Sequence, residues 1–116
     1  MNLREFLKEN RVYLDGGMGT LLQAKGLKPG ELPERWNITH PDIIKDIHKA
    51  YFEAGSNIVC ANTFGANPLK FSDDELSEII SAAIKNAKDA ISELSDSENR
   101  FVALDMGSLG KLLKPL

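Results

Sequence analysis

The order of apolar segments is the feature of this sequence that most restricts its fold. Three short apolar runs lie at residues 11–14, 57–61 and 101–104. Two longer segments with apolar residues at helical spacing separate them, at 39–55 and 72–94. Strands without strict polar alternation that alternate with amphipathic helices are typical of a parallel sheet covered by helices. The sequence therefore predicts an α/β fold with the order β–α–β–α–β.

Residues that begin and end helices mark both amphipathic segments. Thr39 is placed to cap the first, with Asp42 three residues later as its capping-box partner, and Gly55 is placed to end it. Ser72 and Glu75 have the same capping-box spacing at the start of the second segment. The other expected elements are a short helix at 2–10 and a long loop at 15–34.

Small polar residues and then glycine follow each apolar run. The three sequences are Asp15-Gly16-Gly17, Asn62-Thr63-Phe64-Gly65 and Asp105-Met106-Gly107. The carboxyl ends of parallel strands lie at one edge of a sheet, where ligands bind in such folds. With strands about 4.8 Å apart, Asp15, Thr63 and Asp105 would lie within roughly 10 Å of one another. The pattern predicts a small-molecule site, with glycine N–H groups available to a carboxylate.

A purely structural interpretation of these segments is also open, since Asp, Asn and Gly are common wherever a strand passes into a loop. The segment "GGMGT" is weak evidence for phosphate binding, because it lacks the Gly-Lys-Ser/Thr ending of a P-loop. His40 and His48, the only histidines, are expected to be structural. Trp36 is expected to pack a loop and not to touch a ligand.

Composition restricts the partners and the compartment. The 116 residues carry a net charge of -3 with no basic stripe, so neither nucleic acid nor an anionic membrane is an expected partner. No apolar run approaches the roughly 18 residues that span a bilayer, and the charged N-terminus lacks the apolar core of a signal peptide. The single cysteine, Cys60, allows no internal disulfide, so a cytoplasmic location is expected.

Three longer stretches are "YLDGGMGTLLQ", "ERWNITHPDIIKDIHKAYFEAGSNIVCANTFGANPLK" and "ALDMGSLGKLLKPL". They resemble the opening of the homocysteine S-methyltransferase domain, in particular the N-terminal module of cobalamin-dependent methionine synthases. The betaine–homocysteine methyltransferases are similar but more distant. The resemblance implies a (β/α)8 TIM barrel, which needs about 250 residues. Residues 1–116 would then be the incomplete N-terminal portion of such a barrel, with about three β/α units and amphipathic crossover helices.

The chemistry that this resemblance implies depends on residues that the chain lacks. Family members hold a zinc ion with three cysteine thiolates, and the zinc binds the homocysteine sulfur as a nucleophilic thiolate. That thiolate takes a methyl group from methylcobalamin or another donor, which makes methionine. The zinc-binding cysteines lie on later strands, and Cys60 matches none of them, so it is expected to be a packed core thiol. The chain alone is expected to bind no cofactor and to be inactive.

The resemblance carries over the amino-acid end of the homocysteine pocket. The matching positions are Asp15, Gly16, Gly17, Thr63, Phe64 and Asp105. It implies that Asp15 pairs with the substrate ammonium, a charge-assisted contact worth about 1.5–3 kcal/mol when shielded from water. The glycine backbone would meet the carboxylate or amino group of the substrate. Thr63 and Phe64 would supply a hydroxyl contact and an apolar wall, and Asp105 would orient loops.

Two other functions stay open. A three-stranded sheet with helices on one side exposes an apolar face and two edges, so the chain could self-associate or pair with a missing barrel portion and have no catalysis of its own. A different barrel enzyme could share only the strand-end pattern. The sequence also departs from the family at one loop: members commonly have Gly-Pro-Thr/Ser-Gly after the last Asp, whereas Ser108 and Leu109 follow Gly107 here.

Overall fold

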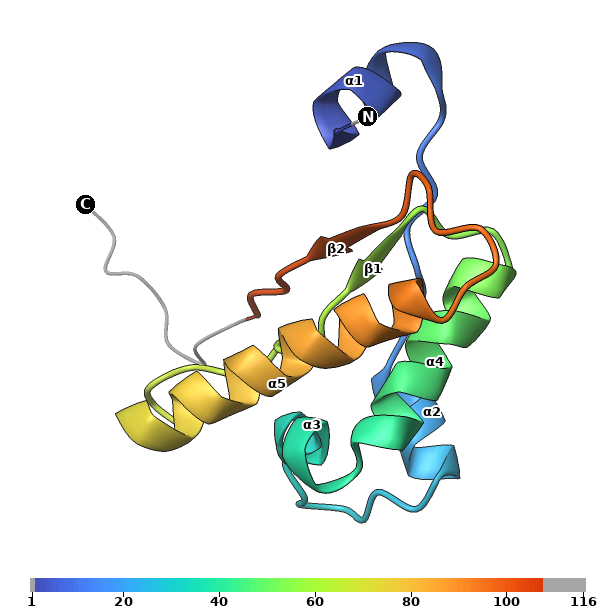
Figure 1. The fold of residues 1–116 in the computed structure, drawn as a ribbon. Helices are drawn as coiled ribbons and strands as arrows, with labels where there is room; N and C mark the ends of the chain where they lie inside the picture. Colours follow the sequence, from blue (N-terminus) through green and yellow to red (C-terminus); the bar gives the residue numbers. More distant parts are fainter. Residues whose placement is uncertain (1, 108–116) are drawn as a thin grey trace, which may run out of the picture.

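A computed structural model of the chain describes residues 2–107, and Figure 1 shows its ribbon. Its helices are α1 (Leu3–Glu9), α2 (Gly19–Ala24), α3 (Trp36–Thr39), α4 (Pro41–Glu53) and α5 (Asp73–Ser92), with a 3-10 turn, η1, at Pro33–Arg35. Its strands are β1 (Ile58–Cys60) and β2 (Phe101–Ala103). None of these described helices is both long and apolar enough to cross a membrane.

The two strands form a parallel sheet in which Ile58 lies opposite Phe101 and Cys60 lies opposite Ala103. The strand predicted at 11–14 does not form. Leu14 makes only one isolated parallel bridge, to Ile58. The predicted three strands are therefore reduced, within the described residues, to two strands and one bridge.

Polar side chains replace most of the backbone hydrogen bonds between this first apolar run and β1. Asn57 Oδ1 accepts a hydrogen bond from Tyr13 N at 3.0 Å, next to the backbone bonds from Asn57 N and Ile58 N to Tyr13 O. Beyond the bridge, Asp15 Oδ2 accepts from Cys60 N at 3.0 Å. The run is thus fixed beside β1, but too few backbone bonds remain to make it a regular strand.

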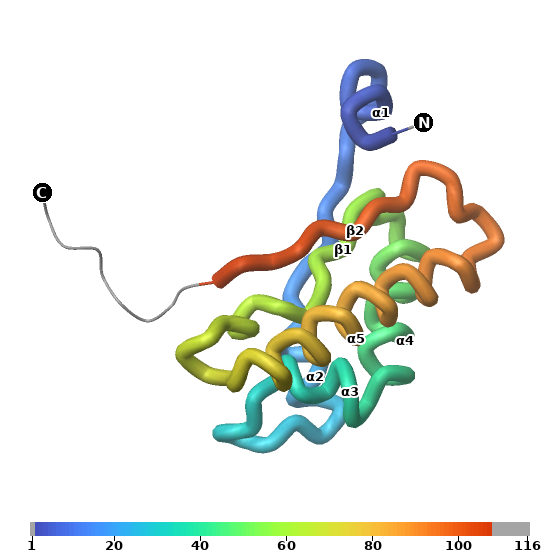
Figure 2. Tube along the Cα trace, turned by 60° about the vertical axis from the view of Figure 1, so that its left-hand side comes forward, coloured from blue at the N-terminus to red at the C-terminus, as the bar shows by residue number. Residues whose placement is uncertain are grey.

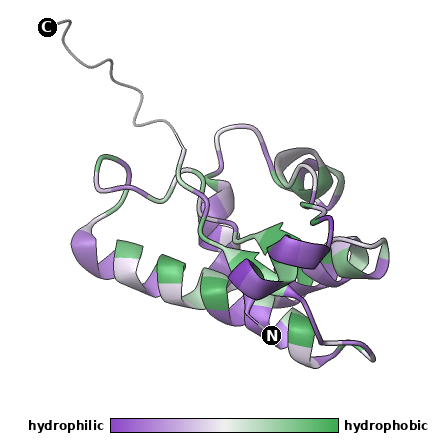
Figure 3. Ribbon diagram, turned by 90° about the horizontal axis from the view of Figure 1, so that it is seen from above, coloured by the Kyte–Doolittle hydropathy of each residue, from purple (hydrophilic) through white to green (hydrophobic). Residues whose placement is uncertain are grey.

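Helices α4 and α5 pack against each other and against one face of the sheet (Figures 1 and 2). Val59 is buried in this layer with Phe52 and Ala87, and Val102 packs beside them. Figure 3 shows the bands of hydrophobic and hydrophilic residues along α5 that allow this packing. The alternation along β1 turns Cys60 toward the opposite face, where it is partly exposed.

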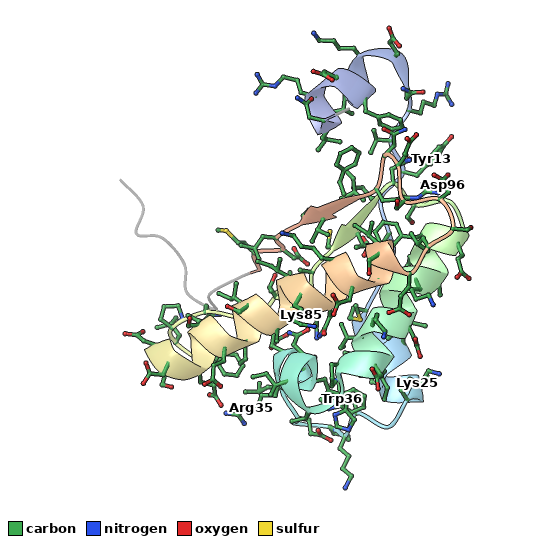
Figure 4. All side chains as sticks on the ribbon, in the orientation of Figure 1. Tyr13, Lys25, Arg35, Trp36, Lys85 and Asp96 are labelled. Carbon is green, nitrogen blue, oxygen red and sulfur yellow. The ribbon has the colours of Figure 1, made fainter. Side chains whose placement is uncertain are left out.

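A second buried cluster joins α2, α3 and α4, and it contains Leu22, Trp36, Ile44 and Ile47. Trp36, labelled in Figure 4, donates from Nε1 to Glu31 Oε2 at 3.1 Å, so it packs a loop as predicted. Helix α2 falls inside the segment predicted as a loop. Leu22 is the only buried residue of α2, which has 6 residues. A helix this short with one buried position has no repeat of apolar residues at helical spacing from which it could be predicted.

The predicted cap of α4 is wrong, whereas the predicted cap of α5 is confirmed. Thr39 is the last residue of α3, and its Oγ1 donates to Arg35 O at 3.3 Å. Because Thr39 is already helical, it cannot take the extended conformation of a capping residue, and His40 precedes α4 without a side-chain cap. Ser72 Oγ accepts from Glu75 N at 3.3 Å, which caps α5.

His48 is a fully buried residue of α4. Neither ring nitrogen has a hydrogen-bond partner among residues 2–107. Burial disfavours the charged imidazolium and lowers the pKa of His48 from 6.5 to about 4. The side chain is therefore a neutral core residue at pH 7, in line with the structural role expected for it.

The substitution His48→Leu should remove a pH dependence of stability. Between pH 6.5 and about 4 the unfolded chain binds a proton that the folded chain excludes, so acidification lowers the free energy of unfolding. The loss is about 1.4 kcal/mol per pH unit in that window. Urea unfolding near pH 7 and near pH 5 should differ less for His48→Leu than for the wild type. Ile44→Leu, at a buried position of the same helix without a titrating group, should keep the wild-type difference, and equal differences in all three proteins would contradict the prediction.

Candidate functional site

A cavity of about 300 Å³ opens at the carboxyl ends of the strands. The predicted site residues that line it are Asp15, Gly16, Gly17, Phe64 and Asp105. They come from the three segments that follow the first apolar run, β1 and β2. Thr63 is 2% exposed and does not line the cavity. The structure thus brings all the predicted residues except Thr63 to one hollow.

Asp15 is a partly buried carboxylate in this cavity. Burial raises the pKa of Asp15 above its usual 3.8. Hydrogen bonds oppose that rise, the main one coming from Cys60 N to Oδ2, and the negative charge of Asp105 adds a smaller increase. The result is a desolvated acid beside a second acid, which a cationic ligand would stabilise in its charged form.

Cys60 also lines the cavity, so the prediction of a packed core thiol is wrong. The reason is its place on β1, where Val59 points toward the helices and Cys60 points away from them. Burial, with the charge of Asp15 as the next cause, raises the pKa of the thiol to about 11. The thiol therefore stays protonated at neutral pH, whereas the thiolate is the form that binds metal or attacks a substrate.

Thr63 joins the loops that follow β1 and β2. Its Oγ1 donates to Asp105 O at 2.7 Å and accepts from Asp105 N at 3.1 Å. Gly107 N donates to Phe64 O at 2.9 Å, and a Cβ at Gly107 would lie only 2.5 Å from that oxygen. The Thr63 hydroxyl is thus engaged by backbone, and the close approach of the two loops requires glycine at 107.

Tyr51 on α4 ties the glycine-rich loop to the helix layer. Its hydroxyl donates to Gly17 O at 2.6 Å. A Cβ at Gly16 would lie 2.9 Å from the same hydroxyl oxygen, so the approach of Tyr51 explains glycine at 16. Tyr51 occupies a position in the apolar pattern of α4, and no motif in the sequence marks its hydroxyl as part of the site.

Three asparagines connect the helix layer to the cavity wall. Asn86 on α5 donates from Nδ2 to Asn37 O at 3.0 Å, and Asn37 donates to Asn62 O at 2.7 Å. Asn62, which lines the cavity, donates to Pro33 O at 2.9 Å. One sequence signal points to this network, because Asn86 interrupts an otherwise apolar stripe of α5. Glu34, which is buried and lines the cavity, has no such signal.

The residues of this site do not fit the zinc ion that the family resemblance implies. Within residues 2–107, no group of three or more His, Cys, Asp or Glu side chains is arranged to hold a metal ion. The chain has a single cysteine, and a single thiol cannot provide a site of three thiolates.

The substitution Thr63→Val should loosen the loop after β2. It removes the partner of both Asp105 N and Asp105 O, which should lower the free energy of unfolding by about 1–3 kcal/mol. Urea unfolding measures the loss, and hydrogen exchange of the Asp105 amide should be faster. Thr63→Ser keeps the hydroxyl and is the matched control. Equal amide protection in the Val and Ser variants would show that these hydrogen bonds do not hold the loop.

Crystal structures of the homocysteine methyltransferase MmuM from Escherichia coli share this fold. The metallated form matches with a TM-score of 0.78 and 22% identity, covering 93% of this chain and 42% of that chain. The apo form matches with a TM-score of 0.66, covering 86% and 38%. These matches support a partial barrel, to which the described residues contribute two parallel strands and one bridge.

Sequence comparison agrees with the fold. Methionine synthases of Mycobacterium tuberculosis and Mycobacterium leprae are 34% and 33% identical to this chain over 96% of its length. The chain spans only 10% of the length of these relatives. The family model described as homocysteine S-methyltransferase matches residues 12–115, a range that includes Ser108 and Leu109, which lie outside the described residues. The chain belongs to the homocysteine S-methyltransferase family.

Proposed function

We propose that this chain forms the amino-acid end of a homocysteine pocket, in an enzyme that transfers a methyl group to the homocysteine sulfur and so makes methionine. The observation that carries the proposal is the cavity lined by Asp15 and the glycine-rich loop, in a chain of this family. The names of its relatives, methionine synthase and homocysteine methyltransferase, support the same reaction.

Each part of the cavity has a role in this proposal. Asp15 pairs with the substrate ammonium, because it is a desolvated carboxylate that gains from a cation. Gly16 and Gly17 are exposed and have no side chains, so their backbone can approach the substrate carboxylate. Phe64, which is 60% exposed, lies beside the substrate methylene groups. Thr63 acts indirectly, through its hydrogen bonds to the loop after β2.

Asp105 has two effects in the proposed pocket. Its backbone is held by Thr63, so it fixes the position of the loop after β2. Its charge also contributes to the raised pKa of Asp15. Both effects act on the shape and the charge of the pocket, and neither requires Asp105 to react.

Zinc and methylcobalamin enter the proposal as groups held by other parts of the enzyme. The described residues offer no group of three metal ligands, and the Cys60 thiol is protonated at neutral pH. The zinc thiolates would therefore come from residues outside this chain. Methylcobalamin is the methyl donor proposed from the likeness to methionine synthases. The contribution of this chain is to bind and orient the amino acid.

A complementary barrel portion is the partner proposed for the sheet. Large apolar side chains near the strands are exposed, and they are Tyr13, Leu14, Leu104 and Met106. The chain also covers only 42% of the matched MmuM chain. A complementary portion would cover these side chains and complete the pocket. Self-association, the alternative, would cover them without supplying zinc ligands, and sedimentation of the isolated chain at several concentrations measures it.

The substitution Asp15→Asn tests the proposed function. Asparagine can still accept from Cys60 N, so the fold should survive, but homocysteine binding measured by calorimetry should weaken about tenfold because the charge is lost. In the wild type, affinity should fall as the pH drops through the raised pKa of Asp15, since the protonated acid no longer attracts an ammonium. The Asn variant should lack this acidic fall.

The matched control is Asp46→Asn, which removes an exposed carboxylate of α4 outside the cavity. It should bind homocysteine like the wild type. Unchanged affinity in Asp15→Asn would contradict the role assigned to Asp15. A wild-type chain that binds no homocysteine would contradict the proposed function as a whole.

A further inference from the structure

Glu34 is a buried acid that faces the same cavity and lies outside the predicted site. It belongs to η1, is 4% exposed and lines the cavity. Within residues 2–107 its carboxylate has no hydrogen bond or ion pair, whereas its backbone oxygen accepts from Asn37 Nδ2 at 2.9 Å and from the backbone N–H of Trp36. Acidic side chains are rarely buried to this extent without a partner. A cationic ligand in the cavity would give this carboxylate the partner that it lacks among residues 2–107.

The carboxylate of Glu34 lies close to the backbone of Gly65. A Cβ at Gly65 would lie 2.7 Å from Glu34 Oε1, so the absence of a side chain at Gly65 makes room for this oxygen. Lys70 Nζ lies 3.2 Å from the same point, but Lys70 is exposed and forms no direct ion pair with Glu34 in the described part of the chain. Lys70 is therefore a cation near this carboxylate that is not bonded to it.

The charge of the cavity points to the same kind of ligand. Three carboxylates line it, from Asp15, Glu34 and Asp105, and no described lysine or arginine does. The remaining titratable group on its wall, the Cys60 thiol, is neutral at pH 7. A cation bound there would be attracted by all three acids, whereas a phosphate would be repelled.

We propose that Glu34 is a second contact for the substrate ammonium, together with Asp15, and that this pair makes the pocket select ligands that carry an amino group. The inference rests on the proposed function, because homocysteine is the source of the ammonium. An ammonium group has three N–H donors, so one carboxylate leaves donors unpaired and a second satisfies more of them. Glu34 thus determines specificity without taking part in methyl transfer.

Binding of two ligands to the full 116-residue chain tests this inference. The ligands are homocysteine and 4-mercaptobutyrate, which lacks only the amino group, and calorimetry measures both affinities. Glu34→Gln removes the charge and keeps the shape. It should weaken homocysteine binding about tenfold and change 4-mercaptobutyrate binding by less than about twofold.

A second variant reaches the same carboxylate without altering Glu34. The methyl group of Gly65→Ala would displace Glu34 Oε1, so this variant should show the same selective loss of homocysteine binding. Lys70→Gln tests whether Glu34 merely pairs with this lysine, and it should not lower the preference for homocysteine. Glu78→Gln, at an exposed position of α5, controls for the loss of a surface charge.

The outcomes separate the inference from the proposed function. Equal losses for both ligands in Glu34→Gln would mean a structural role and overturn the inference, and so would unchanged homocysteine binding. Failure of the wild type to bind either ligand would overturn the proposed function and the inference with it. If Glu34→Gln does not fold, Glu34→Asp, which withdraws the charge by one methylene, replaces it with the same expected selective loss.

Discussion

The junction between the first apolar run and β1 is the interaction on which the cavity depends. Asn57 binds Tyr13 on one side of the single backbone bridge, and Asp15 binds Cys60 N on the other. The hydrogen bond that fixes Asp15 beside β1 also sets its carboxylate at the cavity. One side chain therefore links the position of a chain segment to the charge of the site.

The charged residues on the lining of the cavity are all acidic. They are Asp15, Glu34 and Asp105, and Gly16 and Gly17, which follow Asp15, present backbone without side chains. The Cys60 thiol adds no charge, since burial and nearby acids keep it protonated. Helices α4 and α5 hold this arrangement from behind, through the Tyr51 hydroxyl and the asparagine network.

Sequence patterns predicted the features that have local causes. The cap at Ser72 forms, and Gly55 ends α4 with a φ of +117°, a conformation that favours glycine. Features set by tertiary contacts were not predictable in the same way. Thr39 is taken by the preceding helix, and a continuous apolar run does not say which of its residues faces the helices, so the exposure of Cys60 was missed. The strand-end rule located the cavity, but the burial of Glu34 depends on the folded loops.

The hydrogen bonds that build the cavity join residues far apart along the chain. Asp15 and Cys60 are 45 positions apart, and Thr63 and Asp105 are 42 apart. Closing loops of this length costs chain entropy before any contact is gained, whereas a helix such as α5 forms from bonds between near neighbours. The pocket is therefore expected to form later than the helices when the chain folds. Ligand binding then reports on completed folding, and a circular dichroism signal from the helices does not.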